Sequence, residues 1–132
     1  MTPHVKLATA LIAGVAIGAV AMKGLNAQSG PPAYYIAELF EVTNPDDFKT
    51  YSARVPATVE KYGGRYLARG GTADALEGDP PKRIIVTAFK SMADARAWYN
   101  SPEYSAIRPI RQRSAKSRNF IVEGVADTAK TN

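Results

Sequence analysis

The sequence contains no cysteine, and its single histidine, His4, stands at the extreme N-terminus. Without cysteine the chain can form neither a disulfide framework nor a thiolate metal site. Without histidine beyond position 4, the rest of the chain has no Ser-His or Cys-His nucleophile pair, no histidine-ligated haem and no ordinary zinc site. We therefore expect no metal and no cofactor. Any acid-base chemistry would use Asp, Glu, Tyr or Lys, with Arg available to bind anions.

Long hydrophobic runs are also scarce, and only one occurs. The 16 residues from Leu7 to Met22 carry no charge, follow Lys6 and precede the small-residue sequence Leu25 to Ala27, which is the layout of a secretory signal peptide. A bilayer-spanning helix needs roughly 20 apolar residues. We therefore expect residues 1–27 to be cleaved and the protein to be periplasmic or secreted. An uncleaved inner-membrane anchor facing the periplasm is the alternative, and it would be the only membrane contact.

The charge that remains after such cleavage is small. Loss of Lys6 and Lys23 would leave 15 basic and 12 acidic residues, a net charge of +3. Because both signs are interspersed along most of the chain, we expect no nucleic-acid partner. Only residues 108–118 are basic without an acidic neighbour.

Beyond residue 32 the sequence predicts alternating strands and helices. Asn44 and Pro45 predict the start of a helix, Gly63-Gly64 predict its end, and Pro56 predicts a kink within it. Aromatic and branched residues favour strands over four segments, at 33–42, 65–71, 82–89 and 118–125.

A second helical region lies between the last two strands. Ser91 and Asp94 have capping-box spacing at its start, and Ser101 restarts a helical segment that Pro109 is expected to interrupt. The order β-α-β-β-α-β predicts a ferredoxin-like α+β fold. Right-handed crossovers then place both helices on one face of a four-stranded antiparallel sheet. We assign residues 33–125 to this domain, with 28–32 as a linker and 126–132 as a flexible tail.

Both faces of the predicted sheet are apolar. In the first strand Tyr34 and Ile36 share one face, while Tyr35 and Ala37 share the other. Two helices can cover only one face, and an exposed apolar patch usually marks an interface. A second copy packed on the open face with two-fold symmetry would bury it. We therefore predict a homodimer that forms an eight-stranded, barrel-like core.

Three segments carry a resemblance to a known family. They are "AYYIAELFEVTNPDDFKTYSARVPATVEKYGGRYLARGG", "PKRIIVTAFKSMADARAWYNSPEYSAIRP" and "FIVEGV". Together they resemble the domain-of-unknown-function 1330 family of bacterial proteins, in order and over residues 33–125. The resemblance implies a dimeric α/β-barrel fold and brings no established reaction or catalytic residue. The N-terminal export segment departs from many relatives, which resemble plain soluble domains.

Two charged residues on the strands are candidates for a site. Glu38 alternates with apolar side chains, so burial could raise the pKa of its carboxyl group and make it a proton shuttle; the alternative is access to solvent or a pair with an arginine. Arg69 lies at the end of the second strand beside glycines, where it could bind a carboxylate ligand. A structural salt bridge to Glu38 or Asp74 is the alternative for Arg69.

The stretch "RAWYNSPEYSAIRPIRQRS" at 96–114 gives the other candidates. If its helix continues through Pro109, Tyr104, Arg108 and Arg111 fall on one face. Trp98 and Tyr104 would then wall a pocket between helix and sheet, with Arg108 or Arg111 holding an anionic group. The alternatives are a packed core with a solvated arginine face, or contact with a membrane or polyanion. The basic residues of that last alternative are Arg111, Arg113, Lys116 and Arg118.

These observations favour a small dimeric exported domain that binds a small organic molecule, anionic or aromatic. A cofactor-independent enzyme of isomerase or monooxygenase type, acting on a small aromatic or carbonyl compound, is a second reading that rests on fold analogy. A non-catalytic interaction module of the cell envelope is the third. A cavity joining Glu38, Arg69 and Trp98 would favour the first two.

Overall fold

The structure is a computed structural model, and it describes residues 30–127. The predicted export segment 1–27 lies outside the described residues, as does most of the predicted tail. Within residues 30–127, no helix has the length and apolar character needed to cross a membrane.

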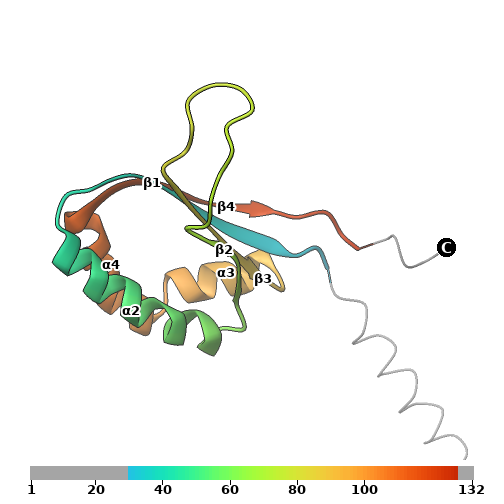
Figure 1. Cartoon of the computed structure of the whole chain (residues 1–132). Helices are drawn as coiled ribbons and strands as arrows, with labels where there is room; N and C mark the ends of the chain where they lie inside the picture. The colour runs from blue at the N-terminus through green and yellow to red at the C-terminus, as the bar shows by residue number, and fades with distance from the viewer. Residues whose placement is uncertain (1–29, 128–132) are drawn as a thin grey trace, which may run out of the picture.

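The elements follow the predicted β-α-β-β-α-β order, with the second helical region in two parts (Figure 1). The four strands form one antiparallel sheet in the order β2-β3-β1-β4, which is the ferredoxin-like arrangement. The elements are β1 (Ala33–Val42), α2 (Pro45–Lys61), β2 (Arg65–Arg69), β3 (Arg83–Phe89), α3 (Met92–Tyr99), α4 (Pro102–Ser114) and β4 (Ala115–Glu123).

Each helix starts at a polar side chain that binds an unpaired backbone amide. The Asn44 side chain accepts a hydrogen bond from the Asp47 amide at 3.1 Å, as predicted for α2. In α3 the Ser91 hydroxyl accepts a hydrogen bond from the Asp94 amide, also at 3.1 Å. Ser101 starts α4 in the same way. These caps satisfy amides that have no partner within the helix.

The predicted interruption at Pro109 is wrong. Pro109 lies inside α4, and Pro56 likewise lies inside α2 without ending it. A proline removes one amide donor, so the carbonyl four residues before it loses its usual partner. For Pro56 that carbonyl belongs to Ser52, and it accepts a hydrogen bond from Arg69 Nη2 at 2.6 Å. Because α4 continues to Ser114, β4 begins at once at Ala115, earlier than the predicted residue 118.

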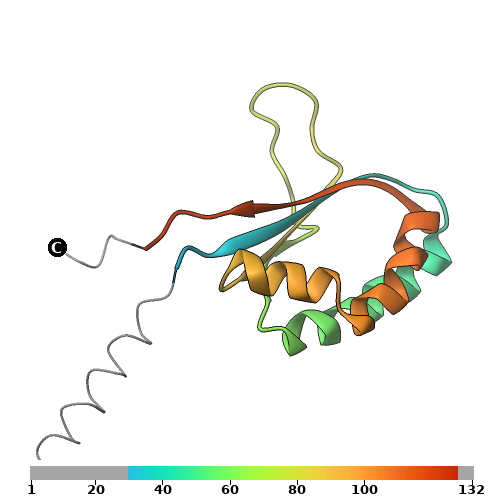
Figure 2. The ribbon, with the colours of Figure 1, turned by 180° about the vertical axis from the view of Figure 1, so that it is seen from behind.

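The helices α2, α3 and α4 cover one face of the sheet, and Figures 1 and 2 show this from two opposite sides. Tyr35, Ala37 and Leu39 of β1 point to this covered face and are at most 4% exposed. Trp98 of α3 and Tyr104 of α4 lie beneath them, 1% and 0% exposed. The core of the domain therefore lies between the helices and this face.

No helix of residues 30–127 lies over the opposite side of the sheet, which we call the open face. Cross-strand pairing places Ile36 of β1 beside Val86 of β3 and Phe120 of β4 on this face. Phe120 and Val122 are each 43% exposed. The connection between β2 and β3, residues 70–82, projects from the sheet on the side away from the helices (Figures 1 and 2). The structure thus agrees with the expectation of a sheet with two apolar faces, only one of them covered.

Candidate functional site

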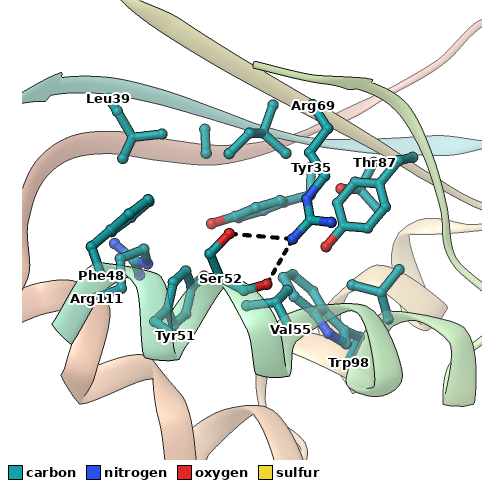
Figure 3. A pocket seen from close by; sticks show the side chains of 14 residues that line it. Tyr35, Leu39, Phe48, Tyr51, Ser52, Val55, Arg69, Thr87, Trp98 and Arg111 are labelled. Atoms are coloured by element: carbon teal, nitrogen blue, oxygen red, sulfur yellow. Dashed lines mark hydrogen bonds between the residues drawn. The ribbon is translucent and has the colours of Figure 1, made fainter. Parts of the chain in front are cut away.

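A narrow cavity of about 30 Å³ lies between α2 and the covered face of the sheet, within a depression of about 440 Å³ that includes the solvent at its mouth (Figure 3). Its walls are mainly aromatic and aliphatic, and its only charged lining residues are two arginines. The lining residues are Tyr35, Ala37, Leu39, Phe48, Tyr51, Ser52, Val55, Val59, Tyr66, Arg69, Ile85, Thr87, Trp98 and Arg111.

Arg111 is the central polar group of this cavity. It lies in the last turn of α4, where a positive charge is favourable at the negative end of the helix dipole. Its side chain enters the interior, and the residue is only 6% exposed. Nη1 donates to Ser117 Oγ and to Asn119 Oδ1, both at 3.1 Å, and Nε donates to the Tyr104 hydroxyl at 3.4 Å.

All these partners of Arg111 are neutral. None of the salt bridges within residues 30–127 includes Arg111, and no carboxylate lines the cavity. Burial works against the charge of Arg111, but the oxygens of Tyr104 and Tyr35 outweigh it, so its pKa is raised and the guanidinium stays charged. A buried cation without an anionic partner is unusual, because burial of an unpaired charge is costly.

Tyrosine hydroxyls surround this cation. Tyr35 accepts a hydrogen bond from Asn119 Nδ2 at 2.6 Å, so Asn119 bridges Tyr35 and Arg111. Burial, followed by the neighbouring Tyr104, raises the pKa of Tyr35 and that of Tyr51 far above the usual value. Both phenols therefore stay protonated at any physiological pH. They can donate hydrogen bonds to a ligand, but they are not bases.

The back of the cavity is a packed aromatic cluster. The Tyr104 and Tyr51 hydroxyls lie 2.7 Å apart, which joins α4 to α2. The Trp98 ring lies 4.2 Å from the Tyr104 ring and 4.9 Å from the Tyr35 ring, measured between centroids. Trp98 Nε1 also donates to Thr58 Oγ1 at 3.0 Å. These contacts hold Tyr104 directly behind the lining, where it positions both Tyr51 and Arg111.

Arg69 lies at the exposed side of the cavity. Figure 3 shows its side chain reaching from β2 to Ser52 on α2, where Nη2 donates to the carbonyl oxygen at 2.6 Å and to Oγ at 3.3 Å. Its guanidinium also lies 4.7 Å from the centre of the Tyr66 ring. Among residues 30–127, Arg69 takes part in no salt bridge, so the structure shows neither of the predicted pairs with Glu38 and Asp74.

Two of the candidate residues lie away from the cavity. Glu38 points to the open face, where its carboxylate accepts a hydrogen bond from Arg118 Nη2 at 2.6 Å. Its surroundings therefore correspond to the alternative of a pair with an arginine. Arg108 donates to the Tyr99 carbonyl at the end of α3, at 2.8 Å, and its guanidinium lies 4.6 Å from the centre of the Tyr99 ring.

The structure thus brings together three candidates, Arg69, Trp98 and Arg111, with Tyr104 just behind them. The sequence reasoning missed Tyr35 and Tyr51 as polar groups of the cavity, because it counted them only as apolar core. It also missed Asn119. The available signal was its alternation with Phe120 and Arg118 along the last strand, which places Asn119 on the covered face.

The chemistry of the cavity is that of a site for anions. Arg111 supplies a positive charge, and neutral hydroxyls supply further donors, within walls that suit an aromatic or other planar apolar body. None of the lining residues is Asp, Glu, His, Lys or Cys, so a general base is absent from the lining. Within residues 30–127, no group of three His, Cys, Asp or Glu side chains could hold a metal ion.

Comparisons with known proteins add the family and the fold. The family described as a domain of unknown function, DUF1330, matches residues 32–125. No curated protein matches the chain significantly. A solved protein of unknown function from Rhodopseudomonas palustris is similar to the chain with a TM-score of 0.59 and 15% identity, over 80% of this chain and 92% of that chain.

Two further solved structures are similar to the chain. SnoaB from Streptomyces nogalater, described as a cofactor-independent oxygenase, gives a TM-score of 0.51 at 10% identity, over 76% of this chain and all 100% of that chain. A protein of unknown function from Thermobifida fusca, described as dimeric and ferredoxin-like, gives a TM-score of 0.48 at 13% identity, over 71% of this chain and 92% of that chain. At such identities the likeness concerns the fold alone.

Proposed function

The chain belongs to the DUF1330 family, and we propose that it is a dimeric domain that binds a small organic anion in the cavity between α2 and the sheet. The observation that carries this proposal is the state of Arg111. It is 6% exposed, it lines the cavity, and none of the salt bridges within residues 30–127 includes it.

The balance of forces at Arg111 favours an anionic ligand. Burial of the guanidinium costs free energy, and its partners Ser117, Asn119 and Tyr104 offset this cost with neutral hydrogen bonds, without an opposite charge. A carboxylate or phenolate would add a charge-assisted hydrogen bond in a region of low dielectric, where such bonds are stronger than in water. The aromatic walls would bury the rest of the ligand.

A homodimer is part of the proposal because of the open face. Phe40, Phe120 and Val122 are 43–45% exposed there or at its edge. Their packing against a second copy would remove this apolar surface from water. The projecting connection 70–82 lies on the same side of the sheet, where it would reach beside the partner (Figure 1).

A cofactor-independent enzyme is the second candidate. Arg111 and the hydroxyls of Tyr35 and Thr87 could stabilise an oxyanion that forms on a small aromatic or carbonyl substrate, and SnoaB shares the fold. Two observations favour binding over turnover. The cavity lining holds no general base, and Glu38, the carboxylate first considered, is paired with Arg118 on the other face. An interaction module without a ligand is the third candidate, and in it the buried charge of Arg111 would keep only neutral partners.

We also propose that the domain acts outside the cytoplasm. This part of the proposal rests on the apolar sequence of residues 7–22 and the small residues before position 28. Mass spectrometry of protein purified from the exported fraction, under native conditions, would report cleavage, subunit number and any retained small molecule together.

The proposed binding is tested by calorimetric titration with benzoate and 4-hydroxybenzoate as probes. We expect Arg111→Gln to weaken binding at least tenfold, because it removes the positive charge but keeps a polar side chain. Arg108→Gln, on the same helix but outside the cavity, is the matched control and should bind like the native protein. Circular dichroism must show that both variants are folded. Equal affinity of the native protein and a folded Arg111→Gln variant would refute the proposed role of Arg111.

A further inference from the structure

A second concave region adjoins the cavity on its exposed side. We call it the outer groove. It is wide, about 1180 Å³ including the solvent above it, and lies between α2 and the strands β2 and β3. It shares Phe48, Ser52 and Arg69 with the cavity, so the two spaces meet. All charged residues that line the outer groove are basic, namely Lys49, Arg69 and Arg83.

Arg83 is the unusual member of this set. Its Nε is buried and has no hydrogen-bond partner, the single such side-chain atom among residues 30–127. Its guanidinium lies 5.5 Å from the centre of the Phe48 ring, on the covered side of the sheet. A buried donor without a partner is rare in folded proteins and calls for an explanation such as a missing ligand.

The backbone beside Arg83 is shaped to accommodate this side chain. Gly70 has a φ of +73°, a conformation that favours glycine, and its amide donates to the Ile84 carbonyl at 2.9 Å. A Cβ atom at position 70 would lie only 2.8 Å from Arg83 Nε. Glycine at this position therefore leaves room for the guanidinium next to the chain.

Arg69 stands where the outer groove and the cavity meet. Its Nη2 is held by the Ser52 carbonyl, which is available because Pro56 has no amide to offer it. None of the salt bridges within residues 30–127 involves Lys49, Arg69 or Arg83. Within the described part of the chain these three cations thus have no salt bridge to a carboxylate, and neither Asp nor Glu lines the outer groove.

We propose that the outer groove is a second anion subsite, which holds a second carboxylate of the ligand that Arg111 binds in the cavity. This inference rests on the proposed function and specifies its ligand as an aromatic dicarboxylate. One carboxylate binds at Arg111, the apolar body lies against Phe48, and the other carboxylate meets Arg83 and Arg69. Arginine suits this role, because its planar fork matches a carboxylate with two parallel hydrogen bonds.

The test compares benzoate with benzene-1,3-dicarboxylate, benzene-1,4-dicarboxylate and biphenyl-4,4′-dicarboxylate, which separate the two carboxylates by increasing distances. Affinities are measured by calorimetry at constant ionic strength. We expect at least one dicarboxylate to bind the native protein tenfold or more tightly than benzoate. Arg83→Gln should abolish this advantage and leave benzoate binding unchanged, whereas Arg111→Gln should weaken both kinds of probe.

Two further variants make the test specific to the outer groove. Lys49→Gln changes an exposed side chain of the outer groove and cannot disturb the core, so it should reduce the advantage of the dicarboxylate without loss of stability. Lys90→Gln, at the opposite end of β3, should change nothing. Inorganic phosphate as a competitor shows whether the outer groove prefers phosphate; displacement of the dicarboxylate at equal or lower phosphate concentration would overturn the assignment to a carboxylate.

The outcomes separate the two proposals. If all probes bind the native protein equally and Arg83→Gln has no effect, the outer groove is not a subsite, while loss of benzoate binding in Arg111→Gln still supports the cavity. If Arg83→Gln weakens the dicarboxylates and Arg111→Gln weakens nothing, the outer groove binds anions and the proposed function of the cavity is wrong.

Discussion

Arg111 and Arg118 are close in sequence and lie on opposite sides of the sheet. Arg118 is on the open face, its side chain is 66% exposed, and it pairs with Glu38 at 2.6 Å. Arg111 is on the covered side, is 6% exposed, and has only neutral partners. An exposed pair contributes little to stability, whereas a buried unpaired cation is costly. The exposed charge of Arg118 is thus paired, although water would screen it, whereas the buried charge of Arg111 has no counter-ion among its partners. We therefore assign the ligand to the covered side.

The apolar residues of the two faces differ in the same way. On the covered face Tyr35 and Leu39 are 4% and 3% exposed, because three helices pack over them. On the open face Phe120 and Val122 keep 43% of their surface exposed. The covered face is closed by the helices of the same chain, whereas no helix of residues 30–127 closes the open face. Changes on the covered face should therefore act on folding and binding, and changes on the open face on association.

The largest expected effect follows from removal of Trp98. Its ring contacts Tyr104, Tyr35 and Phe89, with centroid distances of 4.2, 4.9 and 5.4 Å. Trp98→Ala should lower the free energy of unfolding by about 3–5 kcal/mol, because it leaves a cavity in a packed core. Denaturant unfolding followed by circular dichroism measures the loss. Leu76→Ala, at a position 92% exposed, is the control and should stay close to the native value.

The next effect should be on assembly. Phe120→Asp places a charge on the open face, on the edge strand β4 and opposite Ile36. Burial of that charge against a second copy would be costly, so the variant should be monomeric, with its fold and thermal stability as a single chain retained. Light scattering after size-exclusion chromatography gives the mass. Arg113→Gln, away from the open face, should leave the dimer intact. A native protein that stays monomeric at high concentration would contradict the open-face dimer.

Much of the fold could be predicted from the sequence, because it depends on local signals. Segments rich in aromatic and branched residues predicted the strands, and Asn44 and Ser91 predicted helix starts. Pro109 misled the prediction, since a proline costs one hydrogen bond, and tertiary packing of Tyr104 and Arg111 keeps α4 continuous around it. The effect of Pro56 on Arg69 could not be foreseen, because it depends on which strand lies beside α2.

The candidate site was predictable only in part. Arg111 was identified from helical spacing and Trp98 from its place in the same aromatic stretch, and the structure places both in the cavity. The sequence correctly showed that Glu38 alternates with apolar side chains along its strand. It could not say which face of the sheet the helices would cover. Arg83 and Asn119 were missed, because their significance arises from cross-strand register. Arg83 faces Leu39, and Asn119 faces Ala37, on the covered face.

The smallest expected effect concerns the rim of the covered side, where α2 and α4 are joined by an exposed ion pair. Lys61, the last residue of α2, donates to Glu103 in the first turn of α4, and the Tyr62 hydroxyl donates to the same carboxylate at 2.9 Å. The hydrogen bond from Lys61 is the main reason that the pKa of Glu103 is lowered to about 2 from 4.5, and the same bond raises the pKa of Lys61.

A carboxyl group whose pKa is lower in the folded state stabilises the fold above its unfolded pKa, and this contribution is lost as the pH falls through the folded value. For Glu103 the window extends from pH 4.5 down to about 2. Glu103→Gln should therefore be slightly less stable than the native protein at neutral pH, and should lose less stability across this window. Thermal unfolding midpoints of both proteins at pH 7, 5, 4, 3 and 2 test this, with Glu77→Gln in the exposed connection 70–82 as the control. Parallel curves for Glu103→Gln and the native protein would mean that solvent screens the pair completely, and that α2 and α4 are held over the cavity by Tyr51, Tyr104 and the surrounding core alone.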